Sequence, residues 1–422
     1  MISLKKLRSN PEGIKNILAL KGDHVDINEI LTLDENVRSL KTKANDLRAE
    51  RNKASEEIGR EKKEGKDTNE AIILTRELGD RLKEIETELH EIEDELSELL
   101  YHIPNTPHDS SPVGKDETKN IGVREWGQEA EFDFTPKTHI EIVESLGLLD
   151  FQRSAKLSGS GFPLYMGKGA QLERALINFM VDHHVMNYGF KEIFPPVLML
   201  DSAMRTTGQL PKFEEDMYHT EVDHLYLAPT AEVPVTNIHR DEILDEKDLP
   251  IYYVAYSPCF RRESGSYGKD TRGLLRVHQF NKVELVKFTT PETSYDELEN
   301  LTLQAESILQ CLGLRYRVVE LCTGDLSFAA AKCYDLELWA PGEKKWLEVS
   351  SCSNFEAFQA RRGKIRYRRT DDQKVDYLHT LNGSGVATPR LMVALMETYQ
   401  KKDGSIEFPD AVADFIGIKG LD

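Results

Sequence analysis

The sequence lacks the features of membrane-bound and disulfide-stabilised proteins. No uninterrupted apolar run approaches the roughly 18 residues that span a bilayer, and no apolar segment follows the lysines of the N-terminal MISLKKLRSN, so we expect neither a transmembrane helix nor a secretory signal. The five cysteines form no CxxC pair, and their odd number argues against a disulfide framework. We therefore expect a cytoplasmic protein with no membrane contact and no zinc site.

Common nucleotide-binding and hydrolytic motifs are also missing. The glycine-rich SGSGFPLYMGKGA matches neither GxxxxGK(S/T) nor GxGxxG, and the chain has no GxSxG, HExxH or EF-hand loop. A P-loop, a Rossmann dinucleotide site and the corresponding hydrolases are thereby excluded. The formal net charge of -19 argues against indiscriminate nucleic-acid binding, but it leaves room for a local basic surface.

A heptad pattern of apolar residues is present in the N-terminal part of the chain. It recurs over residues 37–58, where only Arg51 breaks the 3,4 spacing, and with strict 4,3 spacing over residues 78–103. The segment EKKEGKDTNE between the two series contains Gly65 and no apolar anchor, which suits a solvated hairpin tip. We predict an antiparallel two-helix coiled-coil arm over about residues 34–103 that projects from a separate globular domain, although heptads alone fit a dimerising coiled coil equally well.

Charge distinguishes the two helices of this arm. Residues 36–66 carry ten Lys and Arg against six Asp and Glu, whereas residues 67–98 carry three against twelve. A basic helix attracts polyanions. The first helix is therefore the candidate face for a polyanion.

The composition changes after the arm. The segment HIPNTPHDSSPVGKDETKN is rich in Pro, Ser, Asp and Gly, so we expect an extended linker there. At 422 residues the chain is also too long for one compact core. We predict an N-terminal domain over residues 1–103, a linker over 104–120 and a second domain over 121–422.

The second domain is predicted to combine strands with a few helices. AQLERALINFMVDHHVMNYG has the pattern of an amphipathic helix that ends at Gly189. YYVAYSPCFRRE, VHQFNKVELVKF, YRVVEL, YDLELWA and WLEVSSCSNF have the composition of strands, and few helices intervene between them. We therefore predict an antiparallel sheet in an α+β domain.

The segment CFRRESGSYGKDTRGLLRVHQFNKVEL is predicted to form a hairpin around a glycine-rich basic loop. If its arms are extended, Arg261 and Glu263 share one face, and Phe280, Lys282 and Glu284 share a face on the return strand. Such a group suits a nucleotide, because a ring stacks on a base, Arg grips a phosphate with two hydrogen bonds and a carboxylate accepts from an amine. An ordinary salt-bridged ladder fits the same spacing, so the spacing alone leaves both interpretations open.

Three further segments carry regularly spaced polar side chains. In LAPTAEVP, Thr230 and Glu232 share a face if the segment is extended. In WLEVSSCSNF, Glu348 precedes Ser351 by three residues. In LNGSGVATPRLMVALMETYQ, a polar turn is expected to lead into an amphipathic helix that carries Arg390. No single segment identifies a site.

Together with the hairpin, these segments resemble the class II aminoacyl-tRNA synthetases and, within that class, the seryl-tRNA synthetases of the bacterial and eukaryotic type. YGFKEIFPPVL is similar to motif 1, FRRES with RVHQF to motif 2, and GVATPRLMVALMETYQ to motif 3. TGQLPKF, TAE, SYGKDTRGLLRVHQF, EVSSCSNF and FQARR resemble the seryl family in particular. The resemblance covers essentially the whole chain, and it implies the class II fold, an antiparallel sheet flanked by helices and preceded by a helical arm.

The resemblance implies an ATP site with Mg²⁺. It assigns Arg261 to the α-phosphate and Arg390 to the γ-phosphate as the catalytic pair, and it assigns adenine to Phe280 and Glu263. Glu348 and Ser351 are the implied Mg²⁺ ligands, which suits a hard cation that prefers oxygen. The implied ATP-binding positions are Arg261, Arg262, Glu263, Val277, Phe280, Glu348, Val349, Ser350, Ser351 and Arg390.

The resemblance also implies an L-serine site. A site built to hydrogen-bond a hydroxyl rejects alanine, because its polar groups would otherwise stay unpaired, whereas threonine must be excluded by size. The implied reaction forms seryl-adenylate and transfers serine to the 3′ end of tRNA(Ser); whether tRNA(Sec) is a second acceptor stays open. The implied serine-binding positions are Thr230, Ala231, Glu232, Arg261, Glu284, Asn382 and Ser384.

The implied partners extend beyond the small substrates. The arm is expected to grip the long variable arm of tRNA(Ser), the SGSYGKDTRG loop to meet its acceptor end, and motif 1 to form a homodimer. Two other classes remain: a non-catalytic RNA-binding relative, and a ligase that loads a carrier protein and needs no basic arm. Arg261, Glu284, Glu348 and Arg390 are all present, which favours the active enzyme.

Overall fold

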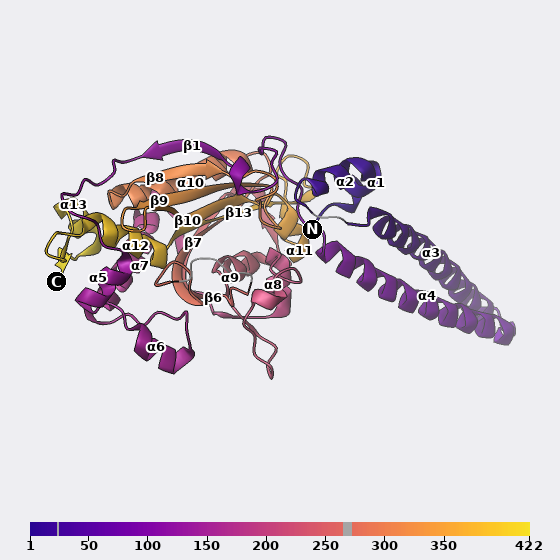
Figure 1. The fold of residues 1–422 in the computed structure, drawn as a ribbon. Coiled ribbons are helices and arrows are strands. Elements are labelled where there is room, and N and C mark those ends of the chain that lie inside the picture. Colours follow the sequence, from indigo (N-terminus) through magenta and orange to yellow (C-terminus); the bar gives the residue numbers. More distant parts are fainter. Residues whose placement is uncertain (23–24, 265–271) are drawn as a thin grey trace. The chain divides into compact units, whose positions relative to one another are not determined.

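The computed structural model describes residues 1–22, 25–264 and 272–422. The chain divides into two compact units (Figure 1). Within the described ranges, every helix is too short or too polar to traverse a bilayer. The first unit comprises Met1, Leu20–Gly22 and Asn105–Asp422, and the second comprises Ile2–Ala19 and Asp23–Pro104.

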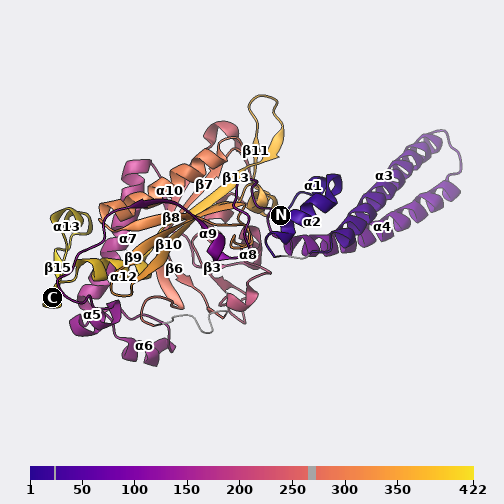
Figure 2. The same ribbon diagram turned by 45° about the horizontal axis from the view of Figure 1, so that its top comes forward.

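The smaller unit is helical. Its helices are α1 (Leu4–Ser9), α2 (Pro11–Ala19), α3 (Ile27–Lys63) and α4 (Asn69–Tyr101). Figures 1 and 2 show α3 and α4 side by side. Ion pairs join these helices: Lys41 Nζ lies 2.6 Å from Glu93 Oε1, and Arg48 Nη2 lies 2.6 Å from Glu86 Oε1. The predicted two-helix arm is confirmed, and its heptads pack within one chain.

The heptad residues form the seam between these two helices. Val37, Leu40 and Ala44 of α3 are buried, as are Leu78 and Leu82 of α4. The first helix begins earlier than the heptads indicated, at Ile27, because the Asp26 carboxylate caps it by accepting a hydrogen bond from the Asn28 N–H at 3.0 Å. The seam therefore follows the sequence pattern, whereas the start of the helix follows its cap.

The larger unit contains an eight-stranded sheet in the order β1-β8-β9-β10-β13-β7-β6-β2. All neighbouring strands are antiparallel except the short edge strand β2, which runs parallel to β6. The predicted α+β class is confirmed. The strand bounds are β1 (Ile121–Trp126), β2 (Lys191–Ile193), β6 (Ile251–Phe260), β7 (Gln279–Thr289), β8 (Tyr316–Glu320), β9 (Lys332–Ala340), β10 (Lys345–Asn354) and β13 (His379–Ala387).

Helices and small sheets surround this sheet (Figure 2). The helices are α5 (His139–Leu146), α6 (Phe151–Ser158), α7 (Gly167–Tyr188), α8 (Asp201–Thr207), α9 (Glu232–Thr236), α10 (Ser294–Cys311), α11 (Phe358–Gly363), α12 (Thr388–Tyr399) and α13 (Asp410–Ile416). Single turns of 3-10 helix lie at Glu117–Lys119, Glu214–Asp216, Asn237–His239 and Glu246–Asp248. The small sheets pair β3 (Leu198–Met199) with β4 (Tyr226–Leu227), β5 (Ile243–Asp245) with β11 (Arg366–Arg368) and β12 (Val375–Tyr377), and β14 (Ile406–Glu407) with β15 (Gly420–Leu421).

The two faces of the sheet have different surroundings. On β7, Val283 and Leu285 point into a large apolar core that includes residues of α7, α10 and α12. Val286 and Phe288 belong to a smaller core with α9 and α11 on the opposite face. Because side chains alternate along a strand, Phe280, Lys282 and Glu284 face the same side as this smaller core. That side of the sheet carries the candidate site.

The hairpin prediction is confirmed, but its end differs from the expectation. Strands β6 and β7 pair in register, with Cys259 opposite Phe280. β6 ends at Phe260, so Arg261 and Glu263 lie beyond it, and Glu263 adopts a left-handed backbone with φ of 54°. Strand alternation therefore does not place these two residues. Most of the expected acceptor-end loop, residues 265–271, lies outside the described residues.

Two further local predictions were wrong. Thr230 and Glu232 are not in an extended segment, because Thr230 lies in a bend and α9 begins at Glu232. LNGSG is not a turn but part of β13, whose backbone pairs with β10 on one side and β7 on the other. A central position in the sheet satisfies the backbone of this glycine-containing segment, which has little strand propensity. The helix predicted to carry Arg390 is present and begins at Thr388.

Candidate active site

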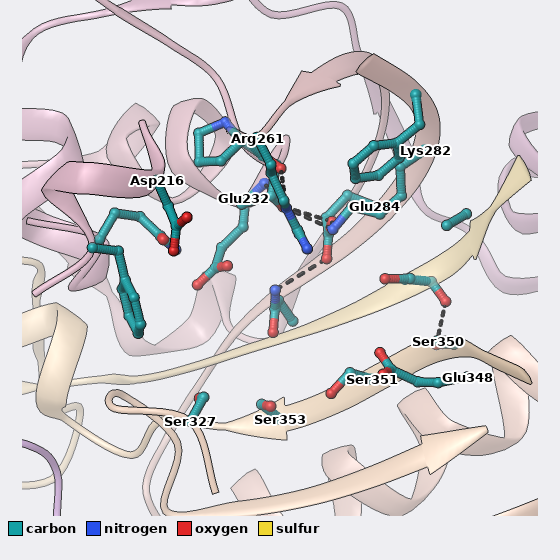
Figure 3. A pocket seen from close by; sticks show the side chains of 18 of the residues that line it. Asp216, Glu232, Arg261, Lys282, Glu284, Ser327, Glu348, Ser350, Ser351 and Ser353 are labelled. Atoms are coloured by element: carbon teal, nitrogen blue, oxygen red, sulfur yellow. Dashed lines mark hydrogen bonds and ion pairs between the residues drawn. The ribbon is translucent and has the colours of Figure 1, made fainter. Parts of the chain in front are cut away.

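A cavity of about 580 Å³ lies on the sheet face that carries Phe280, Lys282 and Glu284. Figure 3 shows Arg261, Glu232, Glu284 and Lys282 at one part of it, and Glu348 with the nearby serines along another strand. Of the positions expected to bind ATP and serine, all but Ala231 and Arg262 line the cavity: Thr230, Glu232, Arg261, Glu263, Val277, Phe280, Glu284, Glu348, Val349, Ser350, Ser351, Asn382, Ser384 and Arg390.

A β-bulge on β10 brings Glu348 and Ser351 to the same side. Residues three apart on a regular strand point to opposite faces. The register to β9 shifts between Glu348, opposite Glu337, and Ser350, opposite Leu336, so the chain gains one residue there. A bulge reverses the alternation beyond it. Both side chains consequently line the cavity.

The side chains around Ser351 present a set of oxygen donors. Ser351 lies opposite Asp335 of β9, and its hydroxyl hydrogen-bonds to that carboxylate. Burial raises the pKa of Asp335 well above its usual range, and the nearby Glu348 carboxylate raises it further. Glu348, Ser351 and Asp335 fit Mg²⁺, because a hard divalent cation prefers oxygen ligands and offsets the repulsion between neighbouring carboxylates. Asp335 was missed by the sequence analysis, since only the strand register brings it beside Ser351.

The aromatic part of the cavity lies at the start of β7. The Arg261 guanidinium carbon is 5.2 Å from the centroid of the Phe280 ring, and Arg261 Nε donates to the Pro229 carbonyl at 3.3 Å. Glu263, despite its left-handed backbone, is held by an ion pair with Arg276. A flat ring beside a held guanidinium suits a base and a phosphate.

Arg390 reaches the cavity from the first turn of α12. Its Nε donates to the Leu275 carbonyl at 3.0 Å, and its Nη1 donates to the Glu348 carbonyl at 2.8 Å. These two backbone acceptors fix the direction of the guanidinium. Arg390 and Arg261 therefore form two cationic points on the same cavity.

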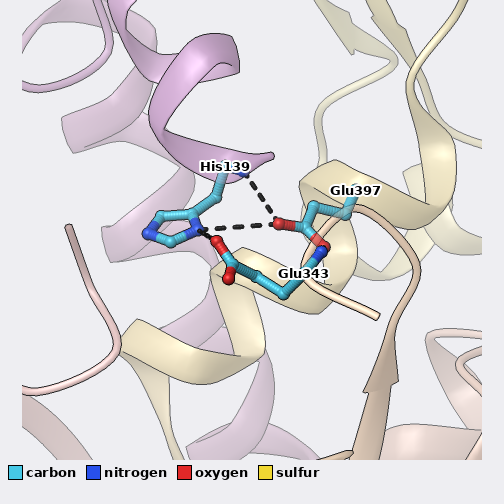
Figure 4. A group of neighbouring side chains, drawn as sticks. All are labelled: His139, Glu343 and Glu397. Atoms are coloured by element: carbon cyan, nitrogen blue, oxygen red, sulfur yellow. Dashed lines mark hydrogen bonds and ion pairs between the residues drawn. The ribbon is translucent and has the colours of Figure 1, made fainter. Parts of the chain in front are cut away.

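A buried group around His139 braces this part of the molecule (Figure 4). The Leu274 N–H donates to His139 Nε2 at 3.2 Å, so the ring proton is on Nδ1. Nδ1 faces Glu343 Oε1 at 3.2 Å and Glu397 Oε1 at 3.5 Å, and Glu397 also accepts the backbone N–H groups of His139 and Gly342, each at 2.8 Å. Although these three side chains have the proximity of metal ligands, a protonated Nδ1 has no lone pair for an ion. The group links α5 and α12 to Leu274. The next residue, Leu275, accepts the hydrogen bond from Arg390 Nε.

A buried polar cluster occupies the other part of the cavity. Thr230 Oγ1 donates to Glu284 Oε2 at 2.8 Å, and Asn382 Nδ2 donates to Glu284 Oε1 at 3.0 Å. The Gln359 side-chain amide donates to Glu232 Oε1 at 2.6 Å. Burial, with the nearby Glu284 carboxylate, raises the pKa of Glu232 to about 7. Two buried carboxylates beside a hydroxyl and an amide suit a small ligand with an ammonium group and a hydroxyl.

Comparisons with known proteins agree with this geometry. Residues 212–399 match the tRNA synthetase class II core domain (G, H, P, S and T), and residues 1–107 match the seryl-tRNA synthetase N-terminal domain. The chain is 52% identical over 418 residues to the serine–tRNA ligase of Carboxydothermus hydrogenoformans, and 53% identical over 421 residues to that of Thermodesulfovibrio yellowstonii, with 99% of each chain covered. It is also similar to a crystal structure of seryl-tRNA synthetase from Pyrococcus horikoshii complexed with ATP, with a TM-score of 0.90 and 40% identity over 100% of this chain and 99% of that one.

The antiparallel sheet, the two arginines at its cavity and the matched core domain define a class II aminoacyl-tRNA synthetase. Such an enzyme is a ligase that forms aminoacyl-tRNA. The chain belongs to the seryl-tRNA synthetase family, since both of its parts and nearly its whole length match that family.

Proposed function

We propose that the cavity joins L-serine to ATP and that the product, seryl-adenylate, is the donor for tRNA(Ser). The supporting observation is one cavity with a buried acidic pair, Glu232 and Glu284, beside two arginines, Arg261 and Arg390. A serine carboxylate oxygen attacks the α-phosphorus, and the bond from that phosphorus to the pyrophosphate oxygen breaks. No protein nucleophile is needed, because the residues position both substrates and balance the developing charge.

The nucleotide occupies the part of the cavity lined by β7 and β10. Arg261 contacts the α-phosphate, Arg390 contacts the γ-phosphate, and Phe280 stacks on adenine with Glu263 near its amino group. Glu348 and Ser351 would hold Mg²⁺, which would supply positive charge to the phosphates. Val277, Val349 and Ser350 line this part of the cavity, and Arg262 is the backbone neighbour between Arg261 and Glu263.

Serine occupies the buried polar cluster. Thr230, Glu232 and Glu284 receive its ammonium and hydroxyl groups, and Asn382 holds Glu284 in place. Ser384 lines the same pocket, and Arg261 lies between this serine pocket and the nucleotide part of the cavity. Ala231 separates Thr230 from Glu232 along the chain. Buried groups that require a hydroxyl partner explain how alanine is rejected.

Serine-dependent exchange of pyrophosphate into ATP tests the proposed activity. We expect exchange with serine and at most a small fraction of that rate with alanine or threonine. The reaction needs no tRNA, so it examines the cavity alone. Exchange with serine no faster than with alanine would reject the proposal and favour the non-catalytic RNA-binding class.

The raised pKa of Glu232 predicts that serine binding depends on pH. An ammonium group pairs with an ionised carboxylate, and Glu232 gains that form as the pH rises through about 7. We expect the KM for serine to be about tenfold higher near about pH 6 than near about pH 8. Steady-state exchange across this range provides the measurement. A Glu232→Gln variant should bind serine weakly with no such dependence, and an unchanged dependence in that variant would contradict the assignment.

The N-terminal arm is proposed to bind the long variable arm of tRNA(Ser). Its basic helix α3 faces solvent through Lys43, Lys53 and Lys62, among other residues. The acidic α4 serves as its scaffold, and residues 264–273 are proposed to contact the acceptor end.

In this assignment residues 1–103 are the tRNA-binding domain, 104–120 the linker and 121–422 the catalytic domain. tRNA(Sec) is included as a second candidate acceptor.

The enzyme is proposed to act as a cytoplasmic homodimer. Motif 1 and its surroundings expose large apolar side chains, with 80% of Met186, 81% of Phe194 and 58% of Leu200 accessible. Exposed apolar side chains that gather into one contiguous patch are typical of an interaction surface. The five free cysteine thiols suit a reducing compartment. Sedimentation that shows only monomer would contradict the dimer.

A further inference from the structure

A lysine lies inside the proposed serine pocket, among the groups that would receive the substrate. Lys282 is on β7, two residues before Glu284, and only 8% of its side chain is exposed. Its ammonium forms an ion pair with Glu284 Oε2 and donates to Thr230 Oγ1 at 3.0 Å. Thr230 in turn donates to the same Glu284 oxygen at 2.8 Å. The three residues close a hydrogen-bonded ring, of which Figure 3 labels Lys282 and Glu284.

The hydrogen bonds of this ring limit the number of acceptor positions that Glu284 retains for a ligand. Oε2 already accepts from both Lys282 and Thr230, whereas Oε1, within the part of the chain that the structure describes, accepts only from Asn382. A carboxylate oxygen has two acceptor positions, so Oε1 retains one. Because Lys282 already balances its charge, Glu284 is suited to a neutral donor such as a hydroxyl rather than to a second ammonium group.

Glu232 has a different environment. Its carboxylate accepts from Gln359, a neutral amide, and lies in the same buried cavity as Glu284. The charge of Lys282 and that of Arg261 stabilise its ionised form, but burial and Glu284 oppose that form more strongly, so its pKa rises to about 7. An incoming ammonium group therefore gains most beside Glu232, where it relieves an uncompensated carboxylate.

We propose that Lys282 is a specificity-determining positioning residue: by pairing with Glu284 and tying it to Thr230, it reserves Glu284 for the hydroxyl of the amino acid and leaves Glu232 for the ammonium. This inference rests on the proposed function. In this inference one side chain, Lys282, determines which of the two nearby carboxylates receives the ammonium group. Contacts between the substrate and the carboxylates would not by themselves distinguish the two. Without Lys282, both carboxylates compete for the same ammonium, and the hydroxyl loses its dedicated acceptor.

The test compares Lys282→Met with the unaltered full-length chain, using the kcat/KM of pyrophosphate exchange for serine and for alanine. We expect the preference for serine over alanine to fall by about tenfold or more, because the hydroxyl acceptor is no longer held. The KM for serine should rise, whereas the KM for ATP should stay within about twofold. Lys282→Arg, which keeps the charge, should recover part of the preference.

Lys287→Met is the matched control. Lys287 is on the same strand, is fully buried and pairs with Glu297 at 2.7 Å, but it does not line the cavity. It should lose stability without losing the preference for serine. If Lys282→Met is too unstable to assay, Lys282→Gln replaces it, since glutamine retains an N–H donor but no charge.

Two outcomes would overturn the inference. In the first, the Lys282 variants keep the preference for serine over alanine. In the second, the kinetic parameters for serine and for ATP worsen to the same extent, as they would after a general structural defect. Both are distinct from failure of the proposed function, in which the unaltered chain itself shows no serine-dependent exchange.

Discussion

Replacing Arg261 with alanine is expected to slow serine-dependent pyrophosphate exchange by about 10³-fold or more. Removing a preorganised group that faces charge in the transition state has effects of this size. Arg261 is held against Phe280 and the Pro229 carbonyl, so its guanidinium is already placed before substrates bind. Most of the loss should appear in kcat, since the charge on the α-phosphate grows during attack.

Two variants make this prediction sharper. Arg261→Lys keeps the charge but loses the planar fork, so it should recover only part of the activity. Arg317→Ala is the matched control, because Arg317 also lies over an aromatic ring, 4.8 Å from Trp346, and pairs with a carboxylate, but outside the cavity. It should leave exchange nearly unchanged. Normal exchange in Arg261→Ala would reject the assigned role.

Removal of the arm is expected to abolish tRNA charging while leaving amino-acid activation nearly intact. Deleting residues 36–100 removes most of α3 and α4, which form a compact unit apart from the sheet. Contacts with tRNA phosphates supply much of the affinity of such complexes, so we expect charging to fall by about 10³-fold. Pyrophosphate exchange by the same variant shows whether the catalytic unit has folded.

Charge substitutions separate the roles of the two arm helices. Lys43, Lys53 and Lys62 on α3 are exposed, and changing all three to alanine should weaken charging and reduce its dependence on salt. Glu88 and Glu91 on the exposed surface of α4 provide the control, since their change to alanine should not weaken charging. Charging that is unaffected by the arm deletion would refute the proposed role of the arm.

Repeating patterns made much of the fold predictable. Heptads determine which faces of α3 and α4 meet, because a 3,4 spacing places apolar residues on one side of a helix. Likewise, alternation along β7 correctly put Phe280, Lys282 and Glu284 on one face, since that strand is regular. Resemblance to a family, rather than spacing, supplied the proposed roles of the other site residues.

Irregular segments were the ones that could not be predicted from spacing. The sequence shows Glu348 three residues before Ser351, yet both line the cavity only because a bulge inserts one residue between them. LNGSG has turn composition, but two neighbouring strands pair with it. In each case pairing with neighbouring strands decides the backbone conformation, so local propensity is overridden.

The sequence by itself determined the two-helix arm, the α+β class and the set of chemical groups available for catalysis. Only the tertiary structure decided how those groups act on one another. Lys282 was visible as a cation on the same face as Glu284, but its contact with Thr230 arises from packing of β7 against the bend before α9. The pKa of Glu232 likewise depends on burial and on a carboxylate contributed by another element, because electrostatic energies depend on distance and solvent exclusion rather than on order along the chain.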